Sequence, residues 1–78
     1  MDKQKQNKIK NWLYKKDIDN YAIENNKISF NFLAGKTRKL FLFYVKRLFG
    51  ESDFYNYNSA DKVEKHFYDG CVVEIHNY

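Results

Sequence analysis

The feature that most constrains this fold is the aromatic content of a short chain: seven Phe, seven Tyr and one Trp in 78 residues. A chain of this length has room for one hydrophobic core. Small cores are marginal, and many chains of this size depend on metal, disulfides or a partner. Each aromatic ring buries a large apolar area, so the sequence predicts one self-folding domain over residues 1–78, as a monomer or a homodimer.

Charge is divided unevenly along the chain. Residues 1–50 contain twelve Lys or Arg and four acidic residues, whereas residues 51–78 contain two Lys and six acidic residues. The two parts have net charges of +8 and −4, which give the +4 of the whole chain. A small domain with this division has one surface that attracts phosphates or acidic proteins and another that repels them.

Lysine supplies most of the positive charge, because only Arg38 and Arg47 are arginines. Arginine makes the commonest specific contact to a base, so this composition counts against a protein that reads nucleic-acid sequence. Lys, Asn, Tyr, Phe and Ile together account for 40 residues, and proline is absent, which is typical of AT-rich coding sequences. Genomic composition is therefore an alternative explanation for part of the lysine excess.

The sequence also limits where the protein functions. The single cysteine, Cys71, excludes an internal disulfide and fits a reducing compartment. The basic N-terminus is not followed by the apolar stretch of a signal peptide. The longest apolar run, residues 40–45, is too short to span a bilayer. We therefore expect a soluble protein in the cytoplasm of the cell that contains it.

Hydrophobic periodicity predicts two helices in the basic part. Residues 3–16 have a narrow stripe at helical spacing, formed by Ile9, Trp12, Leu13 and Lys16. Residues 37–49 have a continuous face formed by Leu40, Phe41, Tyr44, Val45, Leu48 and Phe49. Thr37 is expected to cap the second helix and Gly50 to end it. Because residues 39–45 are apolar on both faces, a buried strand is the alternative there.

A β-hairpin is predicted between these helices. Residues 21–23 and 28–32 flank Glu24-Asn25-Asn26-Lys27, and Asn tolerates the left-handed backbone of a tight turn. In the second segment, apolar and polar residues alternate, which places Ile28, Phe30 and Phe32 on one face.

The acidic part of the chain predicts a helix between two strand-like segments. Residues 53–58 indicate a short strand or an aromatic loop, and Ser59 is expected to cap a helix over residues 60–68 that Gly70 closes. Residues 71–76 are predicted to form the last strand, with Cys71, Val73 and Ile75 toward the core. The expected fold class is α+β: a small single domain with a short, mostly antiparallel sheet of three to four strands packed with two to three helices.

Two groups of residues resemble chemical sites, and the first lies at the start of the second predicted helix. Gly35-Lys36-Thr37 follows a predicted strand and opens a predicted helix, as a phosphate-binding P-loop does. The full P-loop pattern, however, requires a glycine at position 30, which is Phe30. Free amides at this helix start, with Lys36, Arg38 and Lys39, remain a candidate site for a phosphate or an acidic side chain.

His66, Cys71 and His76 lack the tight pairs of a zinc site, and on a strand Cys71 and His76 point to opposite faces. Cys71 is expected to be a buried, small apolar residue. We therefore predict no catalytic residue, no metal site and no cofactor, and a protein that is not an enzyme.

Aromatic residues gather in the acidic part of the chain. Phe54, Tyr55 and Tyr57 lie among asparagines, and Tyr68 is nearby. Tyrosine offers contact area at low entropy cost and asparagine offers adaptable hydrogen bonds, which is typical of recognition surfaces. We predict these four residues as a surface for a protein partner; the alternative is that the rings complete a small core.

Basic residues surround the two predicted helices of the first 50 residues. If the fold brings these helices together, their cations form a surface for a nucleic-acid backbone or an acidic protein groove. The alternative is a solvated lysine face that keeps the protein soluble. The residues of this predicted basic face are Lys8, Lys15, Lys16, Lys36, Arg38, Lys39, Lys46 and Arg47.

Three short segments carry a resemblance: residues 9–13 (IKNWL), 19–23 (DNYAI) and 28–30 (ISF). They resemble the opening of small uncharacterised phage proteins from AT-rich bacteria. The charged, motif-free profile also looks like phage-encoded inhibitors of host machinery, anti-CRISPR proteins among them. That resemblance implies binding to a larger protein or ribonucleoprotein of the host or phage, by occupying a nucleic-acid channel or a functional surface.

Two functions are therefore expected, and neither involves a membrane. The first is a non-enzymatic interaction protein, an inhibitor or accessory factor that binds a larger macromolecule through the aromatic patch and one charged face. The alternative is a small basic nucleic-acid-binding module that uses the predicted basic face.

Overall fold

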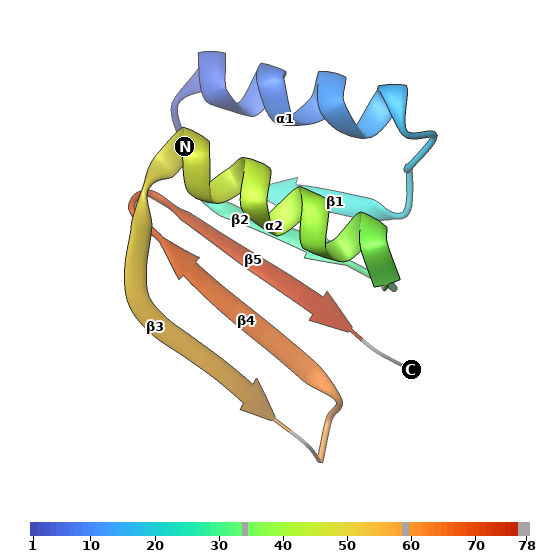
Figure 1. Ribbon diagram of the computed structural model, residues 1–78, viewed down its shortest axis with the longest axis vertical. Coiled ribbons are helices and arrows are strands. Elements are labelled where there is room, and N and C mark those ends of the chain that lie inside the picture. The colour runs from blue at the N-terminus through green and yellow to red at the C-terminus, as the bar shows by residue number, and fades with distance from the viewer. Residues whose placement is uncertain (34, 59, 77–78) are drawn as a thin grey trace.

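The computed structural model describes residues 1–33, 35–58 and 60–76, and for residues 51–56 and 58 it describes the backbone. Within these residues the chain forms two helices and five strands (Figure 1). In chain order they are α1 (Lys3–Lys15), β1 (Tyr21–Glu24), β2 (Lys27–Phe30), α2 (Gly35–Phe49), β3 (Glu51–Asn58), β4 (Val63–Tyr68) and β5 (Cys71–His76). The α+β class expected from the sequence is confirmed.

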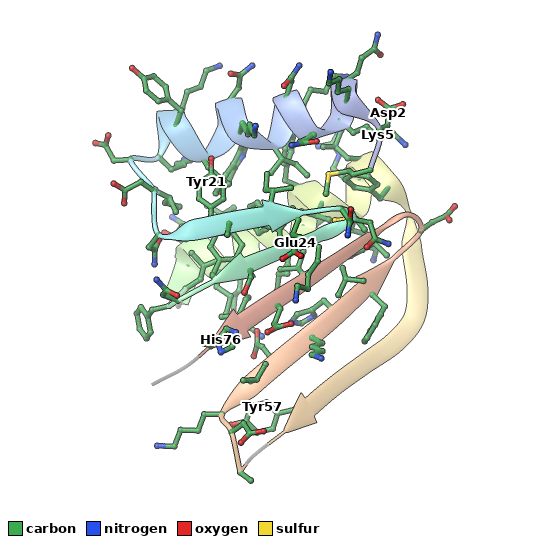
Figure 2. The ribbon with its side chains drawn as sticks, turned by 180° about the vertical axis from the view of Figure 1, so that it is seen from behind. Asp2, Lys5, Tyr21, Glu24, Tyr57 and His76 are labelled. Atoms are coloured by element: carbon green, nitrogen blue, oxygen red, sulfur yellow. The ribbon has the colours of Figure 1, made fainter. Side chains whose placement is uncertain are left out.

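The strands form one mixed sheet in the order β1-β2-β5-β4-β3. Neighbouring strands are antiparallel except for β2 and β5, which are parallel. Both helices pack on one face of the sheet (Figure 1), and no described helix covers the other face (Figure 2). The molecule therefore has a helical layer, a sheet layer and one open sheet face.

Helix α1 begins where the sequence predicts it. The Asp2 carboxylate accepts hydrogen bonds from the amides of Gln4 at 2.7 Å and Lys5 at 3.3 Å, which caps the first turn. Ile9 and Leu13, one turn apart, are fully buried. Trp12 packs beside them and Tyr14 is exposed, and every other residue of the helix is polar. Helix α1 is therefore held to the sheet by the narrow stripe that the periodicity indicated.

The predicted hairpin is also present. Asn25 and Asn26 form a two-residue turn between β1 and β2, and Asn25 has a φ of 56°. Strand β2 ends at Phe30, two residues earlier than expected. Phe32 therefore does not share the inner face with Phe30: its side chain is 53% exposed.

Helix α2 is longer than predicted and is not a strand. It begins at Gly35, so Thr37 lies in its first turn and is not its cap. Gly50 ends the helix as expected, with a φ of 82° and its amide donating to the Lys46 carbonyl at 2.8 Å. Leu40, expected on the inner face, is 43% exposed.

The expected helix over residues 60–68 is wrong, because residues 63–68 form strand β4 between β3 and β5. Gly70, expected after that helix, lies in the turn between β4 and β5, and Ser59 lies outside the described residues. The alternation of β4 is hard to recognise, because its inward positions include Glu64, paired with buried Ile75. This additional strand raises the sheet from the expected three or four strands to five.

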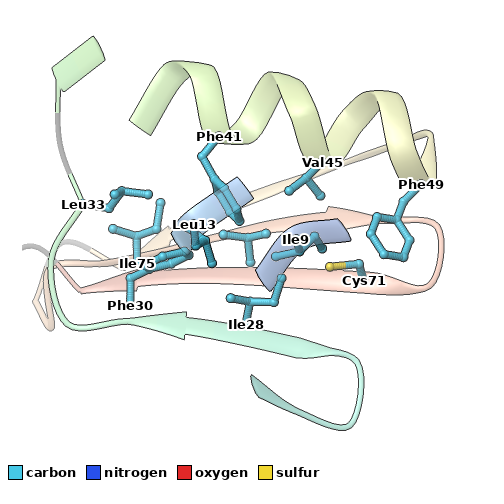
Figure 3. Close-up of a cluster of buried hydrophobic side chains, with 11 residues drawn as sticks. Ile9, Leu13, Ile28, Phe30, Leu33, Phe41, Val45, Phe49, Cys71 and Ile75 are labelled. Atoms are coloured by element: carbon cyan, nitrogen blue, oxygen red, sulfur yellow. The ribbon is translucent and has the colours of Figure 1, made fainter. Parts of the chain in front are cut away.

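The core lies between the two helices and the central strands (Figure 3). Phe41 is its centre: its ring centroid lies 5.0 Å from Phe30 of β2 and 5.5 Å from Trp12 of α1. As predicted, Cys71 is buried beside the other inward residues of β5. The buried apolar residues are Ile9, Leu13, Ile28, Phe30, Leu33, Phe41, Val45, Phe49, Cys71, Val73 and Ile75.

Phe41→Ala is expected to lower the free energy of unfolding by about 3–5 kcal/mol, because it removes a fully buried ring that joins three elements. Phe43→Ala is the matched control on the same helix. Its side chain is 60% exposed, so the change is expected to stay within about 0.5 kcal/mol. Urea titration measures both values, and equal effects of the two substitutions would contradict this description of the core.

Candidate functional site

The two helices lie side by side and run in opposite directions (Figure 1). Trp12 of α1 stacks on Tyr44 of α2, with ring centroids 5.8 Å apart and an interplanar angle of 16°. The Tyr44 hydroxyl donates to the Lys8 carbonyl at 3.5 Å. The Lys5 ammonium lies 5.0 Å from the Phe49 ring centroid, so the start of α1 is beside the end of α2.

Every charged residue within the two helices is positive. Helix α1 contains Lys3, Lys5, Lys8, Lys10 and Lys15, and α2 contains Lys36, Arg38, Lys39, Lys46 and Arg47. The five strands, in contrast, contain Glu24, Glu51, Asp53, Glu64 and Glu74 with only Lys27 and Lys65. The division of charge along the sequence thus becomes a division between the two layers of the fold.

Seven of the eight residues predicted for the basic face are exposed in this helical layer. We call them the basic helical face: Lys8, Lys15, Lys16, Lys36, Lys39, Lys46 and Arg47. Since the helices are antiparallel neighbours, the cations at the end of α1 lie toward the start of α2. The two basic segments, separated in the sequence by the β1–β2 hairpin, therefore form one surface.

Apolar side chains are exposed among these cations. Tyr14 of α1 is 82% exposed, and Phe43 of α2 is 60% exposed. The Arg47 guanidinium lies 5.9 Å from the Phe43 ring centroid, and the Lys16 ammonium lies 5.6 Å from that of Trp12. These distances allow cation–π attraction, so the face combines positive charge with aromatic surface.

Arg38, the eighth predicted residue, turns toward the sheet. Its Nε donates to Glu64 Oε1 at 2.6 Å, and His66 Nε2 lies 3.0 Å from the same oxygen. Because an ionised carboxylate only accepts hydrogen bonds, His66 Nε2 is the donor of the second bond. Glu64 is not among the residues predicted from the sequence. A charged residue at an inward position of a strand would have indicated such a site. The prediction of a helix over residues 60–68 hid this signal, because it did not treat Glu64 as part of a strand.

The Glu64 carboxyl is held in its charged form. Burial alone raises its pKa, but hydrogen bonds from Arg38 and His66 and the positive charge of Arg38 outweigh burial and lower the pKa below its ordinary value. Arg38 thus joins α2 to β4 through a buried charge. It does not contribute to the exposed positive surface.

Charges on the open sheet face compensate one another. Glu74 Oε2 lies 3.7 Å from the Lys27 ammonium and 3.9 Å from that of Lys65. Glu74 Oε1 accepts a hydrogen bond from His76 Nε2 at 2.8 Å. Figure 2 shows His76 and Glu24 on this side of the molecule. The excess positive charge therefore belongs to the helical layer.

The predicted aromatic patch is only partly described. Tyr57 is 49% exposed at the end of the sheet far from α1 (Figure 2). Tyr68 packs against the core, and its hydroxyl donates to the Leu42 carbonyl at 3.5 Å. The side chains of Phe54 and Tyr55 lie outside the described residues. Tyr57 and Tyr68 thus differ in exposure, and Tyr57 is the described member available to a partner.

The described side chains offer little reactive chemistry. Among them, no three His, Cys, Asp or Glu residues gather closely enough to hold a metal ion. Burial raises the pKa of the Cys71 thiol to about 11, which suppresses the nucleophilic thiolate near neutral pH. No helix in the described part of the chain is both long enough and apolar enough to cross a membrane.

Comparisons with known proteins add no relative: no protein-family model, curated protein or solved structure matches the chain.

Glu64→Gln is expected to lower the free energy of unfolding at pH 7 by about 1.5–3 kcal/mol, the range for hydrogen bonds to charged groups. The folded-state pKa lies below the ordinary 4.5. The stabilisation is therefore complete above this ordinary value and is lost as the pH falls through the folded-state pKa. Urea titrations of both proteins between pH 7 and the acid range measure how their difference shrinks.

The exposed carboxyl of Glu24 on β1 provides the control, Glu24→Gln, which is expected to change stability little. A difference between wild type and Glu64→Gln that stays constant into the acid range would show that the Glu64 charge is not stabilising.

Proposed function

We propose that this protein is a non-enzymatic binding protein whose basic helical face binds the phosphate backbone of a nucleic acid. The observation that carries the proposal is the packing of both cation-rich helices on one side of the sheet. Seven exposed cations share this layer, and neither helix contains an acidic residue. Like charges gathered on a small domain repel one another, and a polyanion relieves that repulsion.

The dimensions of the face suit such a ligand. Helix α2 has 15 residues and is therefore about 22 Å long. A DNA duplex carries one negative charge per about 1.7 Å of its axis, so about a dozen phosphates occupy the same length. Several cations of the face therefore meet phosphates at the same time.

The composition of the face favours backbone binding without sequence preference. Lysine is a flexible point charge, whereas bidentate base recognition uses arginine. Of the two arginines, Arg38 is paired with Glu64 and only Arg47 belongs to the basic helical face. We therefore expect similar affinities for nucleic acids of different sequence.

Neutralising one lysine on each helix, Lys8→Gln with Lys36→Gln, is expected to weaken DNA binding. Each lysine that no longer neutralises a phosphate reduces the slope of log K against log salt by about one. Fluorescence anisotropy with a labelled 12-nucleotide DNA, in about 50 to 200 mM salt, measures affinity and slope together. Wild-type affinity should fall steeply over this range.

The matched control, Lys62→Gln with Lys65→Gln, removes the same net charge from residues outside the helices. Its affinity and salt slope are expected to stay close to those of wild type. Equal weakening by both double variants would assign the effect to net charge, and no wild-type binding at low salt would exclude nucleic-acid binding by this face.

A second candidate function is an inhibitor or accessory factor from a phage or mobile element, of the anti-CRISPR kind, that binds a larger protein. The position of β3 favours it. Among the described strands, β3 is last in the sheet and pairs only with β4. An edge strand offers backbone hydrogen bonds to a strand of a partner, and exposed Tyr57 lies on it.

Tyr57→Ala tests this second candidate. Truncating a tyrosine at the centre of a protein interface is expected to weaken partner capture by at least about 2 kcal/mol, roughly thirtyfold. A pull-down from host lysate, followed by a titration with the captured protein, measures the change. Capture that is unchanged by Tyr57→Ala but abolished by Lys8→Gln with Lys36→Gln would move the interface to the basic helical face.

A further inference from the structure

One row of side chains on α2 points away from the core. Lys36, Leu40, Phe43 and Arg47 follow one another at spacings of four, three and four residues, which places them on a single line along the helix. We call this row the α2 stripe. All four residues are exposed, and the opposite side of the helix carries the buried Phe41, Val45 and Phe49. The stripe is therefore the outermost line of the helical layer.

The centre of the α2 stripe is apolar and its ends are charged. Leu40 is 43% exposed and Phe43 is 60% exposed. Lys36 and Arg47 lie one turn beyond them on either side, and Lys39 lies beside the stripe. Phosphate contacts explain the cations at the ends, but they do not explain an exposed phenylalanine between them. The stripe fits a ligand that presents both negative charge and flat apolar surface.

Single-stranded nucleic acid has this pair of properties. Its bases are free to stack on aromatic side chains, while its phosphates follow a positively charged surface. In a duplex the bases stack on one another and are not available to Phe43. The Arg47 guanidinium lies over the Phe43 ring, 5.9 Å from its centroid, so the phosphate next to a base that stacks on Phe43 comes close to this cation.

We propose that the α2 stripe binds single-stranded nucleic acid, with a base stacked on Phe43 and the flanking phosphates bound by Lys36, Lys39 and Arg47. This inference rests on the proposed function and adds a preference for single strands over duplexes. Stacking is available to every base, so the preference does not depend on sequence.

The experiment compares a labelled 12-nucleotide oligothymidylate with a 12-base-pair duplex, using wild type, Phe43→Ala, Phe43→Trp and Tyr57→Ala at near-physiological salt. Wild type is expected to bind the single strand more tightly. Phe43→Ala should weaken single-strand binding by about 5- to 150-fold, the effect of removing one stacked base, and leave duplex binding within about twofold. Phe43→Trp keeps an aromatic ring for stacking, so it is expected to retain single-strand binding. Tyr57→Ala removes an exposed ring far from α1 and should change neither the single-strand nor the duplex affinity.

The outcomes separate this inference from the proposed function. Salt-sensitive binding of both ligands that is unchanged in Phe43→Ala would overturn the stacking inference and leave backbone binding intact. Tighter binding of the duplex than of the single strand would also overturn the stacking inference and leave backbone binding intact. Failure to bind either nucleic acid would overturn both proposals. Phe43-dependent binding of phosphatidylserine vesicles without oligonucleotide binding would also overturn both, and would assign the stripe to an anionic membrane surface.

Discussion

The contact on which the rest of the structure depends is the packing of Phe41 between three elements. Its ring lies on α2, contacts Trp12 of α1 and meets Phe30 of β2 edge-on. Phe30 and Phe41 are the largest fully buried side chains among the described residues, and each aromatic ring buries a large apolar area. Because one side chain joins both helices to the same strand, the helices share one face of the sheet.

This packing determines the distribution of charge. Each helix uses its apolar side to contact the sheet and its neighbour, so its lysines remain on the outside. Two cation-rich helices on opposite faces of the sheet would present two weaker positive surfaces. Because both helices lie on the same face, they create one strong positive surface. On the open face, Glu74 compensates the charges of Lys27 and Lys65. The core and the proposed binding surface are therefore two sides of the same helices.

The elements that were predictable from sequence are those with a local pattern. Helices α1 and α2, the Asn25-Asn26 hairpin and β5 each show their period within their own residues. Strand β4 does not, because inward-facing Glu64 depends on Arg38, 26 residues away in the sequence. Until that pairing is known, Val63–Tyr68 does not look like a strand with a buried face.

The candidate site was predictable only as a set of cations. Arg38 and Lys39 are adjacent in the sequence, but one turns toward the sheet and the other is exposed. Similarly, the apolar pattern of α2 placed Leu40 in the core, although its position on the helix turns it outward beside Phe43. Whether the two basic segments meet depends on the long-range packing of Trp12 on α2, which no local pattern reveals.

If α1 and α2 present one continuous binding surface, a bound oligonucleotide affects the residues of both helices. The most direct measurement is a titration of the isotopically labelled protein with a short oligothymidylate, followed by amide chemical shifts in two-dimensional NMR spectra. The largest shifts are expected in both helices, while the open-face residues of β2 and β5 are expected to change little. Shifts confined to one helix or centred on β3, or no shifts at low salt, would contradict this expectation.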